Sequence, residues 1–245
     1  MRILSWNVNG LEHALSDVQR LAKSYSPDVI CLQETKVSEH VAIDGYLVGV
    51  NPALITVNEG LDAGTLIAIK DTHLQTLKLY TDIEGFAGRL GLASFEDYSI
   101  LNYYAIDTET NPDMHFTRAK CDRLIFKLMQ QLGGDVILCG DLNVTPGKEL
   151  VLPGEEFPLE YCRQGINFEQ PYPEREWLYD MLNHGWYDAL RYVNPQDVTP
   201  TYQSTDRTAV GRLDYFILNH PSKIDRCVIL PKFSSNHCPI LLDFQ

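Results

Sequence analysis

The chain has 245 residues, a formal net charge of −13 and 44% hydrophobic residues, and no Pro-, Gly- or Ser-rich linker divides it. These properties predict one globular domain, residues 1–245, with a large core. The acidic balance argues against a general polyanion-binding protein, although net charge does not fix the field around a site. No apolar run approaches the roughly 20 residues that span a bilayer, and no leader precedes the first strand, so we expect a cytoplasmic protein without a membrane partner.

The first part of the chain predicts a strand, an amphipathic helix and a second strand. Residues 2–7 form an apolar run, residues 14–25 carry apolar side chains at helical spacing, and residues 29–32 form another apolar run. Each apolar run gives way to polar side chains, the first at Asn7 and the second shortly before Glu34. Polar residues at the ends of buried strands are therefore a recurring feature from the start.

The middle of the chain reads as a series of short strands separated by Gly, Asp or Asn. The expected strands are residues 46–50, 65–70, 74–80, 90–95 and 98–104. Their order favours an antiparallel meander. A helix is expected next, and the apolar side chains on its predicted buried face are Leu124, Ile125, Leu128, Met129 and Leu132.

The last part of the chain mixes strands, an irregular segment and a helix. The apolar run at residues 135–139 predicts a buried strand, and residues 173–183 predict a helix. Residues 151–170, rich in Gly, Pro and acids, form either a functional loop or a mobile one. The expected late strands are residues 213–218, 227–230 and 238–244. Many short strands with helices mostly between them predict an α/β (α+β) fold with two packed sheets and outer helices.

Asp141 and Asn143 follow the buried strand at residues 135–139. Strand side chains alternate, so the two side chains point to the same face and can hold a reacting group between them. The alternative is a turn in which Asp and Asn only cap backbone groups. Similar polar groups end the other strands, namely Asn7, Glu34, Asp214, and Asn236 with His237. Their recurrence at five strand ends favours a functional site.

Five short runs carry a resemblance to a known superfamily. They are SWNVNG (5–10), LQETK (32–36), GDLNV (140–144), RLDYFIL (212–218) and SNHCPI (235–240). In order and rough spacing they resemble the endonuclease/exonuclease/phosphatase superfamily, and within it the exonuclease III type of apurinic/apyrimidinic (AP) endonuclease. The resemblance covers residues 2–244. It implies a DNase I-like four-layer α/β sandwich whose active site lies where loops of the two sheets meet.

The resemblance also implies a metal-dependent phosphodiesterase of DNA repair. Such an enzyme hydrolyses the DNA backbone at abasic sites, or acts at 3′ ends as a 3′-to-5′ exonuclease or 3′-phosphodiesterase. The implied partner is duplex DNA with abasic or 3′-blocked sites. A monomer is expected, located with nucleoid DNA in the cytoplasm, or in the nucleus of a eukaryote.

Phosphodiester hydrolysis requires an activated water, in-line attack and stabilisation of charge on the phosphoryl and leaving oxygens. A hard divalent cation with oxygen ligands suits this chemistry. By the resemblance, Glu34 is the principal metal ligand, with Asn7, Asn9 and Asn236 beside it. Mg²⁺ is the expected ion, with Mn²⁺ as a substitute.

The remaining roles are implied in the same way. Asp141 would be the general base, and Asn143 would donate a hydrogen bond to the phosphoryl group. His237, paired with Asp214, would offer an imidazole N–H, because a carboxylate partner fixes the tautomer and raises the pKa. The alternative is that His237 is structural, with its hydrogen bonds made within a turn. Tyr104 aligns with a phosphate-contacting tyrosine of the family, although a strand tyrosine is more often core packing.

Three departures from the family pattern keep other functions open. Asn236 stands where the family usually has Asp, which removes a negative charge beside the metal. Asp107 replaces an amide near the phosphate and would repel it. Of the aromatic residues that line the abasic pocket, only Tyr202 remains. The alternatives are a phosphoesterase of the same superfamily acting on RNA or on a non-nucleic-acid phosphodiester, and a weakened or inactive homologue.

Overall fold

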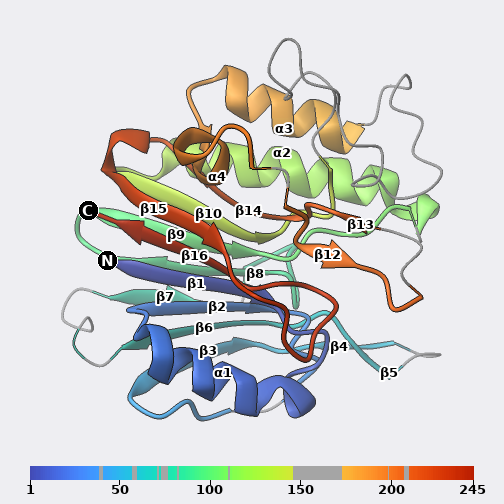
Figure 1. Ribbon diagram of the computed structural model, residues 1–245. Coiled ribbons are helices and arrows are strands. Elements are labelled where there is room, and N and C mark those ends of the chain that lie inside the picture. Colours follow the sequence, from blue (N-terminus) through green and yellow to red (C-terminus); the bar gives the residue numbers. More distant parts are fainter. Residues whose placement is uncertain are drawn as a thin grey trace.

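Two β-sheets pack face to face between outer helices. The computed structural model describes residues 1–38, 41–56, 60–70, 72, 77–81, 83–109, 111–145, 173–197, 199–206 and 210–245. Within these residues, α1 (Leu11–Tyr25) packs on one sheet, and α2 (His115–Gln131) and α3 (Pro173–Asn183) pack on the other (Figure 1). This order of layers confirms the expected α/β sandwich.

Each sheet combines strands from distant parts of the chain. The first sheet has the order β15-β16-β1-β2-β6-β3. Its strands are β1 (Arg2–Asn7), β2 (Val29–Gln33), β3 (Tyr46–Asn51), β6 (Thr65–Lys70), β15 (Ile224–Ile229) and β16 (Ile240–Phe244). The second sheet has the order β11-β14-β10-β9-β8-β7. Its strands are β7 (Lys78–Tyr80), β8 (Leu90–Ser94), β9 (Tyr98–Tyr103), β10 (Asp135–Asp141), β11 (Tyr187–Asp188) and β14 (Asp214–Leu218).

Short elements complete the described structure. They are α4 (Ala189–Val193), two 3₁₀ turns (Pro112–Met114 and Pro221–Lys223), and the hairpins β4 (Leu54–Thr56) with β5 (Gly60–Asp62) and β12 (Tyr202–Gln203) with β13 (Val210–Gly211). Each is too short to show a periodicity, so the sequence pattern predicts none of them. No helix in the described parts of the chain is long and apolar enough to cross a membrane.

Alternating side chains on the strands build the core on both faces of each sheet. In β1, Ile3 faces the second sheet, whereas Leu4 and Trp6 face α1. In β10, Ile137 faces the first sheet and Val136 faces the helices on the other side. Strands buried on both faces have continuous apolar sequences. The charged side chains of β1 and β10 therefore lie at the first or last position of these strands, and β2 carries none.

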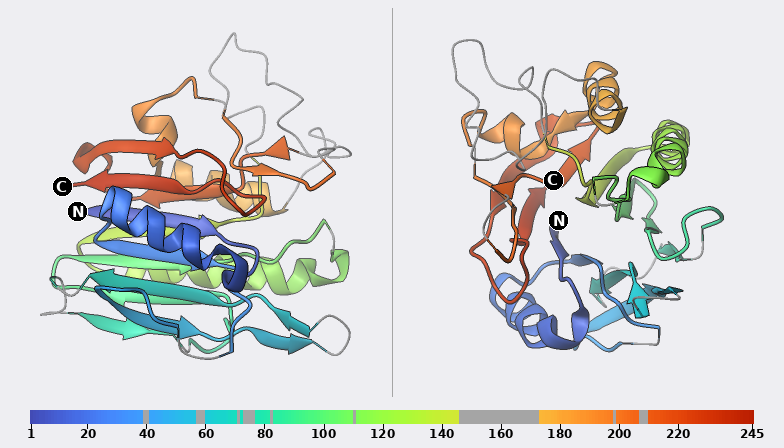
Figure 2. Two further views of the ribbon diagram at one scale, coloured as in Figure 1. Left: turned by 60° about the horizontal axis from the view of Figure 1, so that its bottom comes forward. Right: turned by 90° about the vertical axis from the view of Figure 1, so that its right-hand side faces the viewer.

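The strand ends that carry polar residues meet at one edge of the sandwich. β1 is parallel to β2, and β9 is parallel to β10. β14 runs antiparallel to β10 and begins where β10 ends, so that Asp214 lies opposite Asp141. In Figure 1 this edge is on the right, beside β12 and β13. Figure 2 shows the two termini side by side, and its left view places them at the end of the sandwich opposite this edge. Arg2 lies opposite Asp243 where β1 pairs with β16.

The strands of the middle region do not form the single meander expected from the sequence. β3 and β6 join β2 in the first sheet, whereas β7, β8 and β9 form an antiparallel meander in the second. The local alternation of side chains is the same in either sheet, so only pairing between distant segments decides the assignment. Residues 74–76 of one predicted strand, and the predicted loop at residues 151–170, lie outside the described residues.

The buried face of α2 also differs from the prediction, because Leu124 is 40% exposed. The buried residues of this helix are Arg118, Cys121, Asp122, Ile125 and Met129. They follow the spacing of one helix face. A count of apolar residues misses this face because two of its members are charged and pair with each other inside the protein.

Candidate active site

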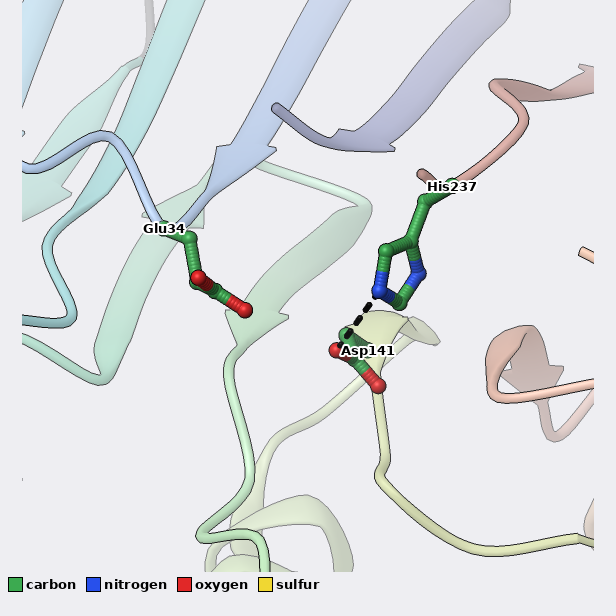
Figure 3. A group of neighbouring side chains, drawn as sticks. All are labelled: Glu34, Asp141 and His237. Carbon is green, nitrogen blue, oxygen red and sulfur yellow. Dashed lines mark ion pairs between the residues drawn. The ribbon is translucent and has the colours of Figure 1, made fainter. Parts of the chain in front are cut away.

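Three ionisable side chains from distant parts of the chain converge at the polar edge. Glu34 follows β2, Asp141 ends β10 and His237 precedes β16, and Figure 3 shows them pointing toward one another. One potential ligand atom from each lies within 4.8 Å of the others. Nε2 of His237 is 3.8 Å from Oδ2 of Asp141. The structure thus brings together three residues singled out from separate strand ends.

Asn7 links the two carboxylates. Its side chain is fully buried, and Nδ2 donates to Oε1 of Glu34 and to Oδ2 of Asp141, both at 2.8 Å. Oδ1 accepts the backbone N–H of Asn9 at 3.0 Å, which defines the orientation of the amide. Asn7 therefore presents nitrogen, not oxygen, to the carboxylates. Asn7 orients the carboxylates in this arrangement, and its role as a metal ligand stays a prediction.

His237 is held by its side chain and by both backbone polar groups. Nδ1 donates to Oδ2 of Asp214 at 2.9 Å. The backbone N–H donates to Oγ of Ser235 at 3.1 Å, and the carbonyl accepts Nε1–H of Trp6 at 3.0 Å. With Nδ1 bound by Asp214, Nε2 is the nitrogen that faces Asp141. This is the orientation that the predicted pairing of Asp214 with His237 requires.

The charged groups of the cluster change one another's pKa values. Burial opposes a charged His237, but Asp214 and Asp141 outweigh it and raise its pKa to about 9. Burial, opposed by His237 and reinforced by Asp214, raises the pKa of Asp141 to about 7. Burial also disfavours a charged Glu34, yet the hydrogen bond from Asn7 and the charge of His237 lower its pKa. At neutral pH the cluster holds an imidazolium, an ionised Glu34 and an Asp141 near its midpoint.

Tyr104 lies beside the carboxylates. Its hydroxyl helps to lower the pKa of the Glu34 carboxylate. The guanidinium carbon of Arg89 lies 4.8 Å from the centre of the Tyr104 ring. Burial, followed by the charges of Glu34 and Asp141, raises the pKa of Tyr104 well above its usual value, so the hydroxyl stays protonated. The structure therefore places the predicted Tyr104 in the cluster, while Arg89 joins it without any signal in the sequence.

Lys36 places a positive charge beside Glu34. Its Nζ is 3.2 Å from Oε2 of Glu34 and donates to Oδ1 of Asn9 at 2.7 Å. The Asn9 oxygen thus accepts a hydrogen bond from an ammonium group, and the role of Asn9 as a metal ligand stays a prediction. No sequence motif predicted a role for Lys36. Its place two residues after Glu34 in the LQETK run is the signal that could have identified it.

The loops that follow β9 and β10 carry Asp107 and Asn143. Asn143 has a left-handed backbone with φ of 45°. Its N–H donates to Oδ1 of Asp141 and its Nδ2 donates to the carbonyl of Ala105, both at 2.9 Å. Oδ1 of Asp107 accepts the N–H of Glu109 at 3.0 Å, which makes a turn within its own loop. Asn143 therefore contacts the cluster directly, whereas Asp107 is not among the three converging ionisable groups.

Tyr202 and Asn236 flank His237. The ring centres of Tyr202 and His237 are 4.8 Å apart at an angle of 56°. Oδ1 of Asn236 accepts a hydrogen bond from Oγ of Ser235 at 3.3 Å. Asn236 also lines an open pocket of about 360 Å³ together with Lys232. Tyr202 thus packs on the imidazole itself, a contact that the comparison of sequence motifs does not predict.

The donor set fits a hard divalent cation. Glu34, Asp141 and Asp214 carry three negative charges when ionised, against the two positive charges of His237 and Lys36. Oδ1 of Asp214 is buried and has no hydrogen-bond partner among the described residues. The imidazolium cannot act as a ligand because both ring nitrogens carry protons. The cluster can therefore hold a cation through carboxylate oxygens, the ligands that Mg²⁺ prefers.

Comparison with known proteins agrees with this geometry. The family model described as the endonuclease/exonuclease/phosphatase family matches residues 4–237. The chain belongs to this family. Its membership confirms the resemblance carried by the five sequence runs, and the two-sheet architecture is the one expected from it.

Individual relatives of this family match along nearly the whole chain. An exodeoxyribonuclease of Bacillus subtilis (strain 168) is 28% identical over 260 residues, covering 99% of this chain and 98% of its own length. A DNA-(apurinic or apyrimidinic site) endonuclease of Dictyostelium discoideum is 26% identical over 258 residues, covering 98% and 69%. The catalytic domain of Xenopus laevis APE2 has a TM-score of 0.80 at 22% identity, covering 100% and 91%. This last similarity shows the fold.

Proposed function

We propose that this family member is a metal-dependent phosphodiesterase of DNA repair. It hydrolyses the backbone of duplex DNA at abasic sites or acts at 3′ ends, as a single-domain monomer located with the chromosomal DNA. The observation that carries the proposal is the convergence of Glu34, Asp141 and His237 within 4.8 Å. The names of the exodeoxyribonuclease and AP endonuclease relatives support the substrate class.

Glu34 is the residue that holds Mg²⁺ in this proposal, with Mn²⁺ as a substitute. Its lowered pKa keeps the carboxylate ionised, and Asn7 fixes the position of Oε1. Glu34 would hold the cation where it could supply positive charge to the phosphoryl and leaving oxygens. Asn236 contributes a neutral amide to this side of the site, so metal affinity is weaker than an aspartate there would give.

Asp141 orients and deprotonates the attacking water. Its two oxygens accept hydrogen bonds from Nδ2 of Asn7 and from the backbone of Asn143, which set the plane of the carboxylate. Burial raises the pKa of Asp141 to about 7 without a cation, and a cation held by Glu34 would lower it. The carboxylate would then be ionised at neutral pH and able to accept a proton from water.

Donors around the cluster stabilise the phosphate charge. His237 offers Nε2–H, and Asp214 keeps the ring oriented. Tyr104 offers a hydroxyl that stays protonated. Asn143 has a second amide hydrogen besides the one given to the Ala105 carbonyl. Lys36 lies beside Glu34, and Arg89 lies over the Tyr104 ring. Both add positive charge at the site, although the net charge of the chain is negative.

A substrate panel tests the proposal. We would compare a duplex with one abasic analogue, a duplex with a 3′-phosphate, RNA and a small phosphodiester, each with and without Mg²⁺. The decisive pair of variants is Asp141→Asn and Asp135→Asn, since these residues end and begin the same strand. We expect only Asp141→Asn to abolish Mg²⁺-dependent cleavage of duplex DNA. Failure to bind or cleave any DNA duplex would overturn the proposal.

One observation favours a second candidate. The carboxylate of Asp107 lies in the loop after β9, within its own turn, and adds negative charge at the edge that carries the site. A phosphodiester with less surrounding charge than duplex DNA would be repelled less. Preferential turnover of RNA or of the small phosphodiester in the same panel would support that candidate.

A further inference from the structure

Arg118 is a fully buried arginine that the proposed chemistry does not use. It lies on the inner face of α2, at 0% exposure. Its Nε donates to both carboxylate oxygens of Asp122, at 2.8 and 2.7 Å. One terminal nitrogen donates to the carbonyl of Ile106 at 2.6 Å, and the other donates to the carbonyl of Leu142 at 2.7 Å. All three nitrogens of the guanidinium therefore have partners.

The two carbonyls belong to the loops that build the site. Ile106 lies in the loop after β9, two residues beyond Tyr104. Leu142 lies between Asp141 and Asn143. The loops also bind each other, because the N–H of Ala105 donates to the carbonyl of Asp141 and Nδ2 of Asn143 donates to the carbonyl of Ala105, both at 2.9 Å. Arg118 thus ties the two loops together through their carbonyl groups.

The partner of Arg118 is itself fixed to the sheet. Asp122 lies one helical turn after Arg118, and its Oδ1 also accepts the hydroxyl of Tyr103, on β9, at 3.1 Å. The guanidinium lies 5.9 Å from the ring centre of Trp177, on α3. The position of the guanidinium is therefore determined by α2, α3 and β9 together.

A purely stabilising role does not explain this arrangement. Buried ion pairs often add little net stability compared with apolar residues of similar volume. The planar arginine fork, however, holds several acceptors in one geometry, which a lysine ammonium does not reproduce. The loop beyond Leu142 needs such support, since Asn143 has a φ of 45°, a conformation that costs energy for a residue other than glycine.

We infer that Arg118 is a positioning residue for the proposed hydrolysis, and that it sets the place of Asp141 and Asn143 by binding the loop carbonyls of Ile106 and Leu142. The inference rests on the proposed function for its kinetic consequence. Its structural consequence, an ordered pair of loops, does not depend on which substrate is cleaved.

The test compares Arg118→Met and Arg118→Lys with Ile125→Ala. Ile125 is buried on the same face of α2 and belongs to the same core, so its truncation lowers stability without touching a loop carbonyl. We expect Arg118→Met to lower kcat roughly 100-fold, because small displacements of reacting groups have effects of this size, and to leave KM nearly unchanged. Arg118→Lys keeps the charge but not the fork, and should recover only part of kcat. Ile125→Ala should keep kcat.

An activity-free measurement accompanies the kinetics. Hydrogen exchange of the Ala105 and Leu142 amides, which donate to Asp141 and Leu213, should become faster in Arg118→Met than in Ile125→Ala at equal global stability. Equal kcat and equal exchange in the two variants would overturn the inference. If the wild-type chain cleaves no phosphodiester, the proposed function fails. The hydrogen-exchange measurement alone then tests whether Arg118 orders the two loops. If Arg118→Met does not fold, Arg118→Lys and Asp122→Asn are compared with Ile125→Ala in the same way.

Discussion

Nδ1 of His237 donates to Oδ2 of Asp214 across 2.9 Å, within the buried part of the site. Replacing Asp214 by Asn keeps the shape but removes the charge that supports the imidazolium. We expect Asp214→Asn to lower kcat by a factor on the order of 100. This factor is at the lower end of what general acid–base catalysis contributes to enzyme rates. The His237 pKa, followed by NMR of the imidazole, should fall in the same variant. An unchanged His237 pKa would contradict the role given to this pair.

Folding stability should decrease at alkaline pH because of His237. Its pKa is raised from 6.5 to about 9 in the folded protein, with burial opposed by Asp214 and Asp141. A raised folded-state pKa contributes stability that is fully present below the unfolded pKa and is lost as pH rises through the folded pKa. The contribution is about 3 kcal/mol, at about 1.4 kcal/mol per pKa unit.

Urea unfolding of the metal-free protein at pH 6.5 and at pH 9 measures this loss. Asp141 titrates in the same range, and its pKa is held down by His237, so both measurements are made in the Asp141→Asn background. We expect the loss of stability between the two pH values to be smaller in Asp141→Asn/His237→Gln than in Asp141→Asn. An equal loss in the two variants would assign the pH dependence to other groups, including the buried thiols.

Metal binding should lower the pKa of Asp141. Without metal, burial and Asp214 hold this pKa at about 7 against the opposing charge of His237. A divalent cation held by Glu34 would favour the ionised carboxylate. Carboxyl ¹³C NMR, with Asp141→Asn to assign the signal, should show the midpoint moving to lower pH when Mg²⁺ is added. This shift of the Asp141 midpoint should be absent in Glu34→Gln. If the shift persists in that variant, a residue other than Glu34 holds the cation.

Asn236→Asp should strengthen metal binding. The change adds a carboxylate next to His237, at the position where the sequence resemblance expects one. We expect Mg²⁺ affinity, measured by calorimetry, to rise on the order of tenfold, within the range seen when the surroundings of a metal site are altered. Asn183→Asp adds the same charge at the exposed end of α3 and should not change the affinity. If Asn236→Asp binds Mg²⁺ no more tightly than the wild-type protein, Asn236 does not limit metal affinity.

Local sequence patterns predict the longer elements and the chemical groups of the site. The bounds of β1, β6 and α3 agree with the predicted ranges, because continuous apolar runs and helical spacing are local properties. The strand-end positions also identified Glu34 and Asp141, since a strand buried on both faces admits charge only where it stops.

How those groups face one another depends on contacts between distant segments. Asn7 reaches Asp141 across 134 positions of the chain, and the direction of its amide depends on the Asn9 N–H. Tyr202 packs on His237 because β12 approaches the segment before β16. Arg118 is buried because two carbonyls and Asp122 surround its guanidinium. Local patterns cannot encode these contacts, because each one depends on the pairing and packing of segments far apart in the sequence.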